Sequence, residues 1–464
     1  MRYLIAGNGV AGTRAAETLR QHDPHGEIVL LSAEEVPFYR RPALVDHLAG
    51  RVSLADLWGR PEPFYREKSV QLRLGQSAVG LDPQAHRLTL AGGEALAYDR
   101  LLLAVGIARR VDWVPGAGLQ GVFSLQRLAD LSALRAFAEG ARAAVVVGEG
   151  VIGVEMARAF RILGIRVTYL IPGPRFWADA IGPEASTLVE ERLRSEGVEV
   201  RPNQVVQEFL GKSRVHAVST SSGEQVEAGL VGLSAGLGPV LPWAEAAGLK
   251  MEGDRIQVDD SLATSLPDVY AAGDAVRLPG EAVPYGWLRA WHQGAAAGAN
   301  LAGAGVPFRR RTVTLSTRVF GMPILVTGNP NPAGQKVRRE RGDYPQGGVY
   351  KELVIDDEGR VVGAVMVGEV SEAGKVEDLV RRQVPYGQAD PKLLRALFDS
   401  RYWLTSRAEI LCPVCKYLIQ IGEQELREGR ITCPICGAEF GLRPTGDRFV
   451  VVLEQGRCSV RRSV

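Results

Sequence analysis

Two copies of one glycine pattern constrain this 464-residue chain more than any other feature. The first runs Tyr3-Leu-Ile-Ala-Gly-Asn-Gly-Val-Ala-Gly12 and the second Val145-Val-Val-Gly-Glu-Gly-Val-Ile-Gly153. In each copy an apolar run predicts a buried parallel strand. The glycines that follow have the G-x-G-x-x-G spacing, which makes a tight turn, admits a pyrophosphate to the backbone and lets the next helix pack on the strand. The helix N-terminus then faces the phosphates.

One such copy would be weak evidence, because a glycine-rich turn between a strand and a helix needs no ligand. The repeat, with a helical pattern after each copy, predicts two dinucleotide sites. The first candidates for cofactor binding are therefore the six glycines Gly7, Gly9, Gly12, Gly148, Gly150 and Gly153.

Composition predicts a multidomain enzyme outside the membrane. At about 150 residues per domain the length corresponds to roughly three domains, and a formal net charge of +2 gives no general attraction to nucleic acid or acidic membranes. No apolar run approaches the roughly 18 residues of a membrane span. The first predicted strand begins at Tyr3, which leaves no room for a signal peptide, so we expect a cytoplasmic location.

The first fingerprint also needs an acid for the ribose hydroxyls. The second predicted strand, 28–31, leads to Glu34, which lies 22 residues after Gly12 and near the expected spacing. A solvated loop carboxylate is the simpler interpretation of Glu34. Arg41 follows shortly after, where a guanidinium can reach a cofactor phosphate or a ring carbonyl.

Three segments then occur in one order: Tyr98-Asp-Arg-Leu-Leu-Leu-Ala-Val-Gly106, the second fingerprint, and Val269-Tyr-Ala-Ala-Gly-Asp274. Over residues 1–380 the chain resembles the pyridine nucleotide-disulfide oxidoreductase superfamily of two-dinucleotide-domain flavoproteins. The resemblance implies FAD on a domain that is interrupted by an inserted NAD(P)H domain. It also implies that Gly106 and Gly273 border the flavin, that the carboxylate of Asp274 binds the ribityl chain, and that the small-residue segment 291–300 packs beneath the flavin.

The positions of the cysteines indicate which branch of this superfamily the chain resembles. No cysteine precedes Cys412, and only a thiolate can perform thiol-disulfide chemistry, so we expect no redox-active dithiol at the flavin. The segments 38–50 and 351–368 resemble ferredoxin and rubredoxin reductases and the flavin half of nitrite reductase large subunits. That branch usually has a lysine where Asp46 stands, so the lysine's role does not transfer. Asp46 and His47, in a predicted loop, are candidates only for tuning the flavin, and we assign no catalytic acid or base.

The choice between NADH and NADPH stays open. The strand 167–171 of the second fingerprint unit ends without an acid, whereas NADH-using relatives generally have a glutamate there. Arg175 lies 22 residues after Gly153 and would accept a 2′-phosphate, although an exposed arginine in a Pro/Gly loop is ordinary. Glu155 is similar to a family position near the nicotinamide; it also suits the first turns of a helix.

The C-terminal region predicts a metal site. Cys412-Pro-Val-Cys415 and Cys433-Pro-Ile-Cys436 are two C-x2-C knuckles with 17 residues between them, and this spacing is typical of zinc bound by four thiolates. A rubredoxin-like iron centre is the alternative, because tetrahedral sulfur sites accept either metal. Zinc is favoured, since Lys416 stands where the first knuckle of a rubredoxin has glycine. Cys458 receives no role.

The pattern predicts an α/β fold with two Rossmann-like dinucleotide-binding domains, a C-terminal α/β interface domain and a small four-cysteine metal module. The expected boundaries are 1–111 and 248–306 for the FAD domain, 112–247 for the NAD(P)H domain, 307–402 for the interface domain and 403–464 for the metal module.

The function predicted is an FAD-dependent NAD(P)H oxidoreductase that passes hydride to flavin and electrons to an acceptor such as a ferredoxin- or rubredoxin-type protein, a small oxidant or oxygen. Two alternatives remain. In the first, the chain is a reductase fused to its own rubredoxin-like iron centre. In the second, it is a redox-sensing adaptor whose zinc ribbon binds a partner. The acceptor and the oligomeric state, a homodimer included, stay open.

Overall fold

The computed structural model describes residues 1–464 except 110–113, 235–236, 239–240, 279–285, 309–313, 333–335, 343–347, 399–407, 413, 415–416, 422–427, 446–447, 454–455 and 462–464. The chain divides into two units. The first comprises Met1–Pro174 and Gly197–Arg310, and the second Arg175–Glu196 and Arg311–Val464.

The first unit contains a five-stranded parallel sheet built around the first glycine fingerprint. Its strands are, in spatial order, β22 (Val269–Ala271), β9 (Arg100–Leu103), β1 (Arg2–Ala6), β2 (Glu27–Leu31) and β5 (Val70–Arg73). Helices cover parallel strands on both faces, so their sequences are nearly continuous apolar runs. A strand near the C-terminal end of the unit thereby pairs with strands from its N-terminal part.

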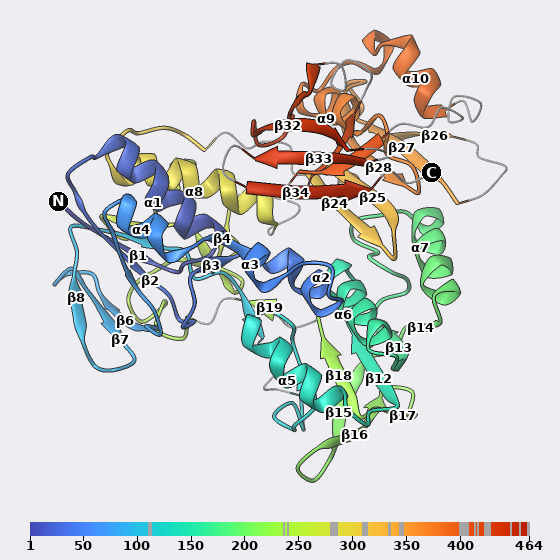
Figure 1. The fold of residues 1–464 in the computed structure, drawn as a ribbon, viewed down its shortest axis with the longest axis horizontal. Coiled ribbons are helices and arrows are strands. Elements are labelled where there is room, and N and C mark those ends of the chain that lie inside the picture. The colour runs from blue at the N-terminus through green and yellow to red at the C-terminus, as the bar shows by residue number, and fades with distance from the viewer. Residues whose placement is uncertain are drawn as a thin grey trace. The chain divides into compact units, whose positions relative to one another are not determined.

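Helices α1 (Val10–His22) and α8 (Trp287–Leu301) lie side by side although they are far apart in sequence (Figure 1). Gly294 and Gly298 allow this close approach. A Cβ at Gly294 would lie 2.3 Å from the carbonyl oxygen of Ala11, and one at Gly298 would lie 2.4 Å from that of Ala15. The small residues of segment 291–300 therefore pack on α1, while their predicted position beneath the flavin stays a prediction.

Short elements surround this sheet. They are the pair β3 (Phe38–Tyr39) and β4 (Trp58–Arg60), the helices η1 (Arg41–Ala43), α2 (Leu44–Leu48), α3 (Leu54–Leu57) and α4 (Glu62–Glu67), the antiparallel β6 (Ala78–Asp82), β7 (Arg87–Leu90) and β8 (Ala95–Ala97), the sheet of β20 (Met251–Glu252), β21 (Arg255–Gln257) and β23 (Val276–Arg277), and the pair β10 (Ala108–Arg109) and β19 (Leu237–Gly238).

A second parallel sheet carries the second fingerprint. Its order is β11 (Val122–Phe123), β18 (Leu230–Leu233), β12 (Ala143–Val147), β13 (Arg166–Ile171) and β14 (Val198–Pro202), with helices α5 (Leu128–Ala138) and α6 (Val151–Ile162). The antiparallel strands are β15 (Val206–Gly211), β16 (Val215–Thr220) and β17 (Gln225–Glu227).

The second unit is built on an antiparallel sheet of β24 (Thr314–Val319), β25 (Met322–Gly328), β28 (Val361–Val367), β27 (Tyr350–Ile355) and β26 (Arg338–Arg341). Helices α7 (Pro183–Ser195) and α9 (Ala373–Arg381) contact β28. The remaining elements are η2 (Tyr386–Gln388), α10 (Pro391–Phe398), β29 (Ala408–Leu411), β30 (Leu418–Ile421), β31 (Arg430–Thr432), β32 (Glu439–Thr445), β33 (Arg448–Leu453) and β34 (Gly456–Arg461).

The predicted mixed α/β fold with two parallel sheets is confirmed, while the domain boundaries drawn from the sequence stay a prediction. Within the described part of the chain, no helix combines the length and apolarity needed to cross a membrane.

Candidate dinucleotide and metal sites

The first glycine loop, between β1 and α1, has no room for larger residues. Gly7 has φ +121°, and a Cβ there would lie 2.1 Å from the carbonyl oxygen of Ala104. A Cβ at Gly12 would lie 1.8 Å from the carbonyl oxygen of Gly7. Gly9 caps α1, and no acidic side chain occupies the helix's first turn. The positive end of the helix dipole therefore faces a backbone cradle that suits phosphates.

The other predicted residues of this site follow the carboxyl ends of the same parallel strands. Glu34 comes after β2, Gly106 after β9, and Gly273 and Asp274 after β22. Because parallel strands end at one edge of a sheet, these positions share that edge with the glycine loop. Gly106 and Gly273 have φ angles of +67° and +86°, a region that favours glycine.

Glu34 and Arg41 form an ion pair at this edge. The other carboxylate oxygen of Glu34 accepts a hydrogen bond of 2.7 Å from the hydroxyl of Tyr39. Nη1 of Arg41 lies 3.6 Å from the position of a Cβ on Gly9. The guanidinium thus lies beside the first glycine loop, as the predicted phosphate contact requires, and it also binds the carboxylate predicted for the ribose.

Asp274 lies in a cationic environment. Its Oδ1 accepts a hydrogen bond of 3.0 Å from the backbone N–H of Gly286, and its carbonyl accepts one from Nη1 of Arg255. Burial raises the pKa of Asp274 above its ordinary value, although the Gly286 hydrogen bond and the charges of Arg289, Arg255 and Arg41 all oppose that rise.

Two buried side chains that the sequence did not single out hold Gly273 in place. Oε1 of Gln293, which is 0% exposed, accepts a hydrogen bond of 2.7 Å from the Gly273 N–H. Nη1 of Arg289 donates to the Gly273 carbonyl at 2.9 Å. The signal that could have identified them in the sequence is their polar character within helix α8, which otherwise consists largely of small and apolar residues.

Two buried amide nitrogens near the first fingerprint have no hydrogen-bond partner among the described residues: Nδ2 of Asn8 and Nε2 of Gln293. Asn8 is 9% exposed, and its Oδ1 accepts from Thr13 and Tyr65 at 3.0 and 2.9 Å. A buried unpartnered donor is costly. Cradle, cations and spare donors together fit a dinucleotide with acidic phosphates and polar hydroxyls.

The second glycine loop, between β12 and α6, is braced from two sides. A Cβ at Gly148 would lie 1.9 Å from Oγ of Ser234, and one at Gly153 would lie 2.1 Å from the hydroxyl of Tyr169. That hydroxyl donates to the carbonyl of Gly150 at 3.1 Å, and burial raises the pKa of Tyr169. Gly150 caps α6, whose first turn contains no acidic residue. This loop has the same features as the first.

An ionic network joins the two fingerprint regions. Nη1 of Arg158 on α6 lies 2.9 Å from Oδ1 of Asp46, and its Nη2 lies 2.6 Å from Oε2 of Glu155. Asp46 also binds Arg51 at 2.8 Å. Asp46 and His47 were expected in a loop; they lie in helix α2, and Nδ1 of His47 lies 2.8 Å from the carbonyl oxygen of Val52.

The pKa values of the two carboxyls in this network are shifted in opposite directions. For Asp46, burial raises the pKa, but hydrogen bonds and charges from Arg51 and Arg158 outweigh burial and leave the pKa below its ordinary value. For Glu155, burial raises the pKa more than Arg158 lowers it, and the charge of Asp46 adds to the rise.

Arg175 belongs to the second unit. Its Nη2 donates to the carbonyl of Ala178 at 3.2 Å, and its buried Nε has no hydrogen-bond partner in the described structure. Its predicted contact with a 2′-phosphate stays a prediction.

Three of the four predicted metal ligands converge. The sulfur atoms of Cys412, Cys433 and Cys436 all lie within 4.8 Å of one another, and those of Cys412 and Cys436 are 3.6 Å apart. Ligands about 2.3 Å from one tetrahedral ion are separated by about 3.8 Å, whereas disulfide sulfurs are about 2.05 Å apart. Cys415 lies outside the described residues.

Both knuckles are closed by the same hydrogen bond. The N–H of Cys412 donates to the carbonyl of Tyr417 at 2.6 Å, and that of Cys433 donates to the carbonyl of Ala438 at 2.8 Å. Each bond joins a cysteine to the residue five positions later. The two knuckles therefore share this hydrogen bond.

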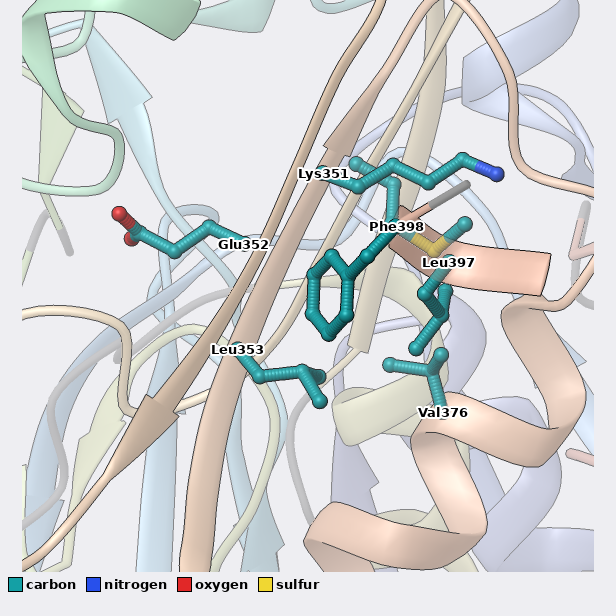
Figure 2. Close-up of a pocket in the computed structure, with 7 residues that line it drawn as sticks. Lys351, Glu352, Leu353, Val376, Leu397 and Phe398 are labelled. Carbon is teal, nitrogen blue, oxygen red and sulfur yellow. The ribbon is translucent and has the colours of Figure 1, made fainter. Parts of the chain in front are cut away.

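A pocket in the second unit is no substrate cavity (Figure 2). Lys351, Leu353, Val376, Leu397 and Phe398 are among the residues that line it, and it contains no space that a water-sized sphere can enter. Lys351 is 1% exposed, and its ammonium forms an ion pair with Glu369. This lysine serves the packing of β27.

Comparisons with known proteins agree with this geometry. The family model described as "Pyridine nucleotide-disulphide oxidoreductase" matches residues 1–298. An NADH oxidase of Methanocaldococcus jannaschii is 27% identical over 81% of this chain and 90% of its own length. A rubredoxin-NAD(+) reductase of Pseudomonas putida is 35% identical over 59% of this chain and 71% of its own.

A nitrite reductase [NAD(P)H] of Bacillus subtilis is 25% identical, and the match covers 82% of this chain but 47% of that protein. Among solved structures, the covalent complex of putidaredoxin reductase with putidaredoxin matches with a TM-score of 0.76 and 25% identity, over 85% of this chain and 95% of that chain.

The rubredoxin reductase and nitrite reductase branches that the sequence resembled are thus both found among its relatives, and the predicted recognition is confirmed. A match of residues 1–298 spans more than half of the 464 residues. The chain belongs to the pyridine nucleotide-disulphide oxidoreductase family and is an oxidoreductase.

Proposed function

We propose that this protein is an FAD-dependent NAD(P)H oxidoreductase that delivers electrons to a small redox protein of the ferredoxin or rubredoxin type. The observation that carries the proposal is the pair of glycine cradles in one unit, each with a helix N-terminus free of acidic residues in its first turn. When bound, FAD would accept hydride from the nicotinamide and release electrons singly to the acceptor.

The chain's own residues would bind and orient the two dinucleotides. Gly7, Gly9 and Gly12 would admit the FAD pyrophosphate, with Arg41 beside it. Asp274 and Gly273 would border the ribityl chain and ring, with Gly106 on the same edge. Gly148, Gly150 and Gly153 would bind the pyrophosphate of the nicotinamide cofactor, and Glu155 would lie near its nicotinamide. Charge and distance, rather than acid-base catalysis, would be the protein's contribution.

Relatives support the choice of acceptor. The P. putida relative is a rubredoxin-NAD(+) reductase, and the putidaredoxin reductase structure contains that enzyme's redox partner. No cysteine precedes Cys412, so the proposed electron delivery would proceed without a redox-active dithiol.

The test is steady-state NAD(P)H oxidation by the FAD-loaded protein with a ferredoxin, a rubredoxin, nitrite and oxygen offered separately. We expect turnover with at least one small redox protein to exceed turnover with oxygen at least tenfold. Equal rates with oxygen and both proteins would favour an oxidase and contradict the proposed acceptor class.

We also propose that Cys412, Cys433 and Cys436, with Cys415, hold one zinc ion that organises the C-terminal region. Zinc is redox-inert, so electron transfer would not pass through it. One iron per chain and a visible colour that persists after flavin removal would instead favour the fused rubredoxin-like centre.

A further inference from the structure

The second glycine fingerprint carries an acid at its variable position: Gly148-Glu149-Gly150. The strand that would normally present the ribose acid, β13, ends at Ile171 and continues as Pro172-Gly173-Pro174 without one. In a Rossmann unit an acid at this strand end binds the ribose hydroxyls of NAD, and an arginine nearby accommodates the 2′-phosphate of NADP.

The carboxylate of Glu149 lies at this strand end. An ideal Cβ on Gly173 would be 3.0 Å from Oε2 of Glu149. The charge of Glu149 also acts on Tyr169 of β13, whose hydroxyl braces the glycine loop. The fold therefore brings an acid from the loop to the position where the strand lacks one.

The backbone of the receiving segment is fixed. The Gly173 carbonyl accepts a hydrogen bond of 2.8 Å from the N–H of Asn203, and the Ile171 carbonyl accepts one of 3.0 Å from the N–H of Gln204. The side chain of Glu149 is exposed.

We infer that Glu149 is the residue that selects NADH over NADPH, by accepting hydrogen bonds from the adenosine ribose hydroxyls and by repelling a 2′-phosphate. This inference rests on the proposed function, because it assigns the second glycine loop to the nicotinamide cofactor. It also opposes the preference for NADPH that Arg175 would give. Two anions at hydrogen-bond distance repel strongly, whereas a carboxylate that accepts from a hydroxyl forms a charge-assisted bond.

The experiment compares NAD⁺ and NADP⁺ binding to the oxidised, flavin-loaded protein by calorimetry, together with kcat/KM for NADH and NADPH. We expect the wild type to prefer the coenzyme without the phosphate. Glu149→Gln should move the ratio of the two dissociation constants toward NADP⁺ by at least tenfold. Glu227→Gln, an exposed glutamate of β17 that pairs with Arg166, is the matched control and should leave the ratio unchanged.

A relocation variant tests the position of the charge. Glu149→Gly removes the carboxylate and makes room for a side chain at residue 173. Adding Gly173→Glu to this variant then returns an acid to the end of the strand. The double variant should regain a preference for NADH that Glu149→Gly alone has lost. A merely structural role for Glu149 would not give this recovery.

Binding of both nucleotides with a ratio that stays within twofold of wild type in Glu149→Gln would overturn the inference and leave the proposed function standing. A wild-type preference for NADP⁺ would overturn it as well. If the wild type binds neither nucleotide and neither reduces the flavin, the proposed function and the inference fail together.

Discussion

Nη1 of Arg158 lies 2.9 Å from Oδ1 of Asp46, and this contact joins helix α6, behind the second glycine loop, to helix α2. Arg158 binds Asp46 and Glu155 at once. The network therefore keeps a positive group next to Glu155.

Removing the carboxylate should weaken this junction. Asp46→Asn is expected to lower the free energy of unfolding by about 1 kcal/mol, because Asp46 is 36% exposed and exposed ion pairs contribute little. Chemical denaturation at neutral pH measures the loss. Glu227→Gln, which breaks an exposed pair, is the control and should cost less.

The effect of Asp46→Asn should depend on pH. Since the pKa of Asp46 is lowered in the folded state, its stabilisation is fully present above the unfolded carboxyl pKa of about 3.9 and is lost as the pH falls through the lowered value. Wild type and variant should therefore converge in stability in acid. A stability difference that is the same in acid as at neutral pH would contradict this assignment.

Asp274→Ala should weaken flavin retention. A hydrogen bond to a charged group contributes about 1.5–3 kcal/mol, so the dissociation constant for FAD is expected to rise roughly tenfold or more. Asp274→Asn, which keeps an acceptor for the Gly286 N–H, should lose less. Flavin fluorescence during dialysis measures both. Unchanged FAD affinity in the alanine variant would remove Asp274 from the site.

Gly298→Ala should strain the contact of α8 with α1. The added Cβ would lie 2.4 Å from the carbonyl oxygen of Ala15, and overpacking of this kind costs about 1–3 kcal/mol even though alanine favours a helix. Gly92→Ala is the matched control, because a Cβ there meets nothing within 4 Å. Equal melting temperatures of the two variants would contradict this packing.

Arg175→Ala separates two explanations of coenzyme choice. If Arg175 binds the 2′-phosphate, the KM for NADPH should rise at least tenfold while that for NADH stays near wild type. If Glu149 determines the coenzyme preference, Arg175→Ala should change the KM for NADPH and the KM for NADH by similar factors. Steady-state kinetics with each coenzyme distinguishes the two outcomes.

Cys433→Ser should abolish metal binding and leave turnover with artificial dyes largely intact. Loss of a structural metal destabilises the segment that its ligands hold together. Elemental analysis should find about one zinc per wild-type chain and none in the variant. New protease sensitivity near the C-terminus is expected with Cys433→Ser and absent with Cys458→Ser.

Much of the fold could be predicted from sequence, because each fingerprint combines a strand, a turn and a helix within a dozen residues. The cluster of Cys412, Cys433 and Cys436 was predictable for the same reason, since short knuckles encode their own geometry. The role of Arg255 could not be predicted, and that of Arg289 was indicated only by its polar character within helix α8. They reach Asp274 and Gly273 through buried side chains, and such contacts depend on how separate elements pack.

The role inferred for Glu149 could not be predicted from the sequence either. It occupies the variable position of a motif whose glycines drew attention, and only the fold brings its carboxylate to Gly173. The prediction of a loop around Asp46 was wrong, because Asp46 lies in helix α2. A helix of five residues is too short for its periodicity to be recognised in the sequence.

The proposed oxidoreductase function is tested by anaerobic addition of NADH or NADPH to the flavin-loaded protein, followed by absorbance and by chromatography of the released flavin. We expect that the bound flavin is FAD, that it bleaches within one equivalent of reduced coenzyme, and that it recovers its colour when an electron acceptor is added. A flavin that stays oxidised with both coenzymes, or one that proves to be FMN, would contradict the proposed function.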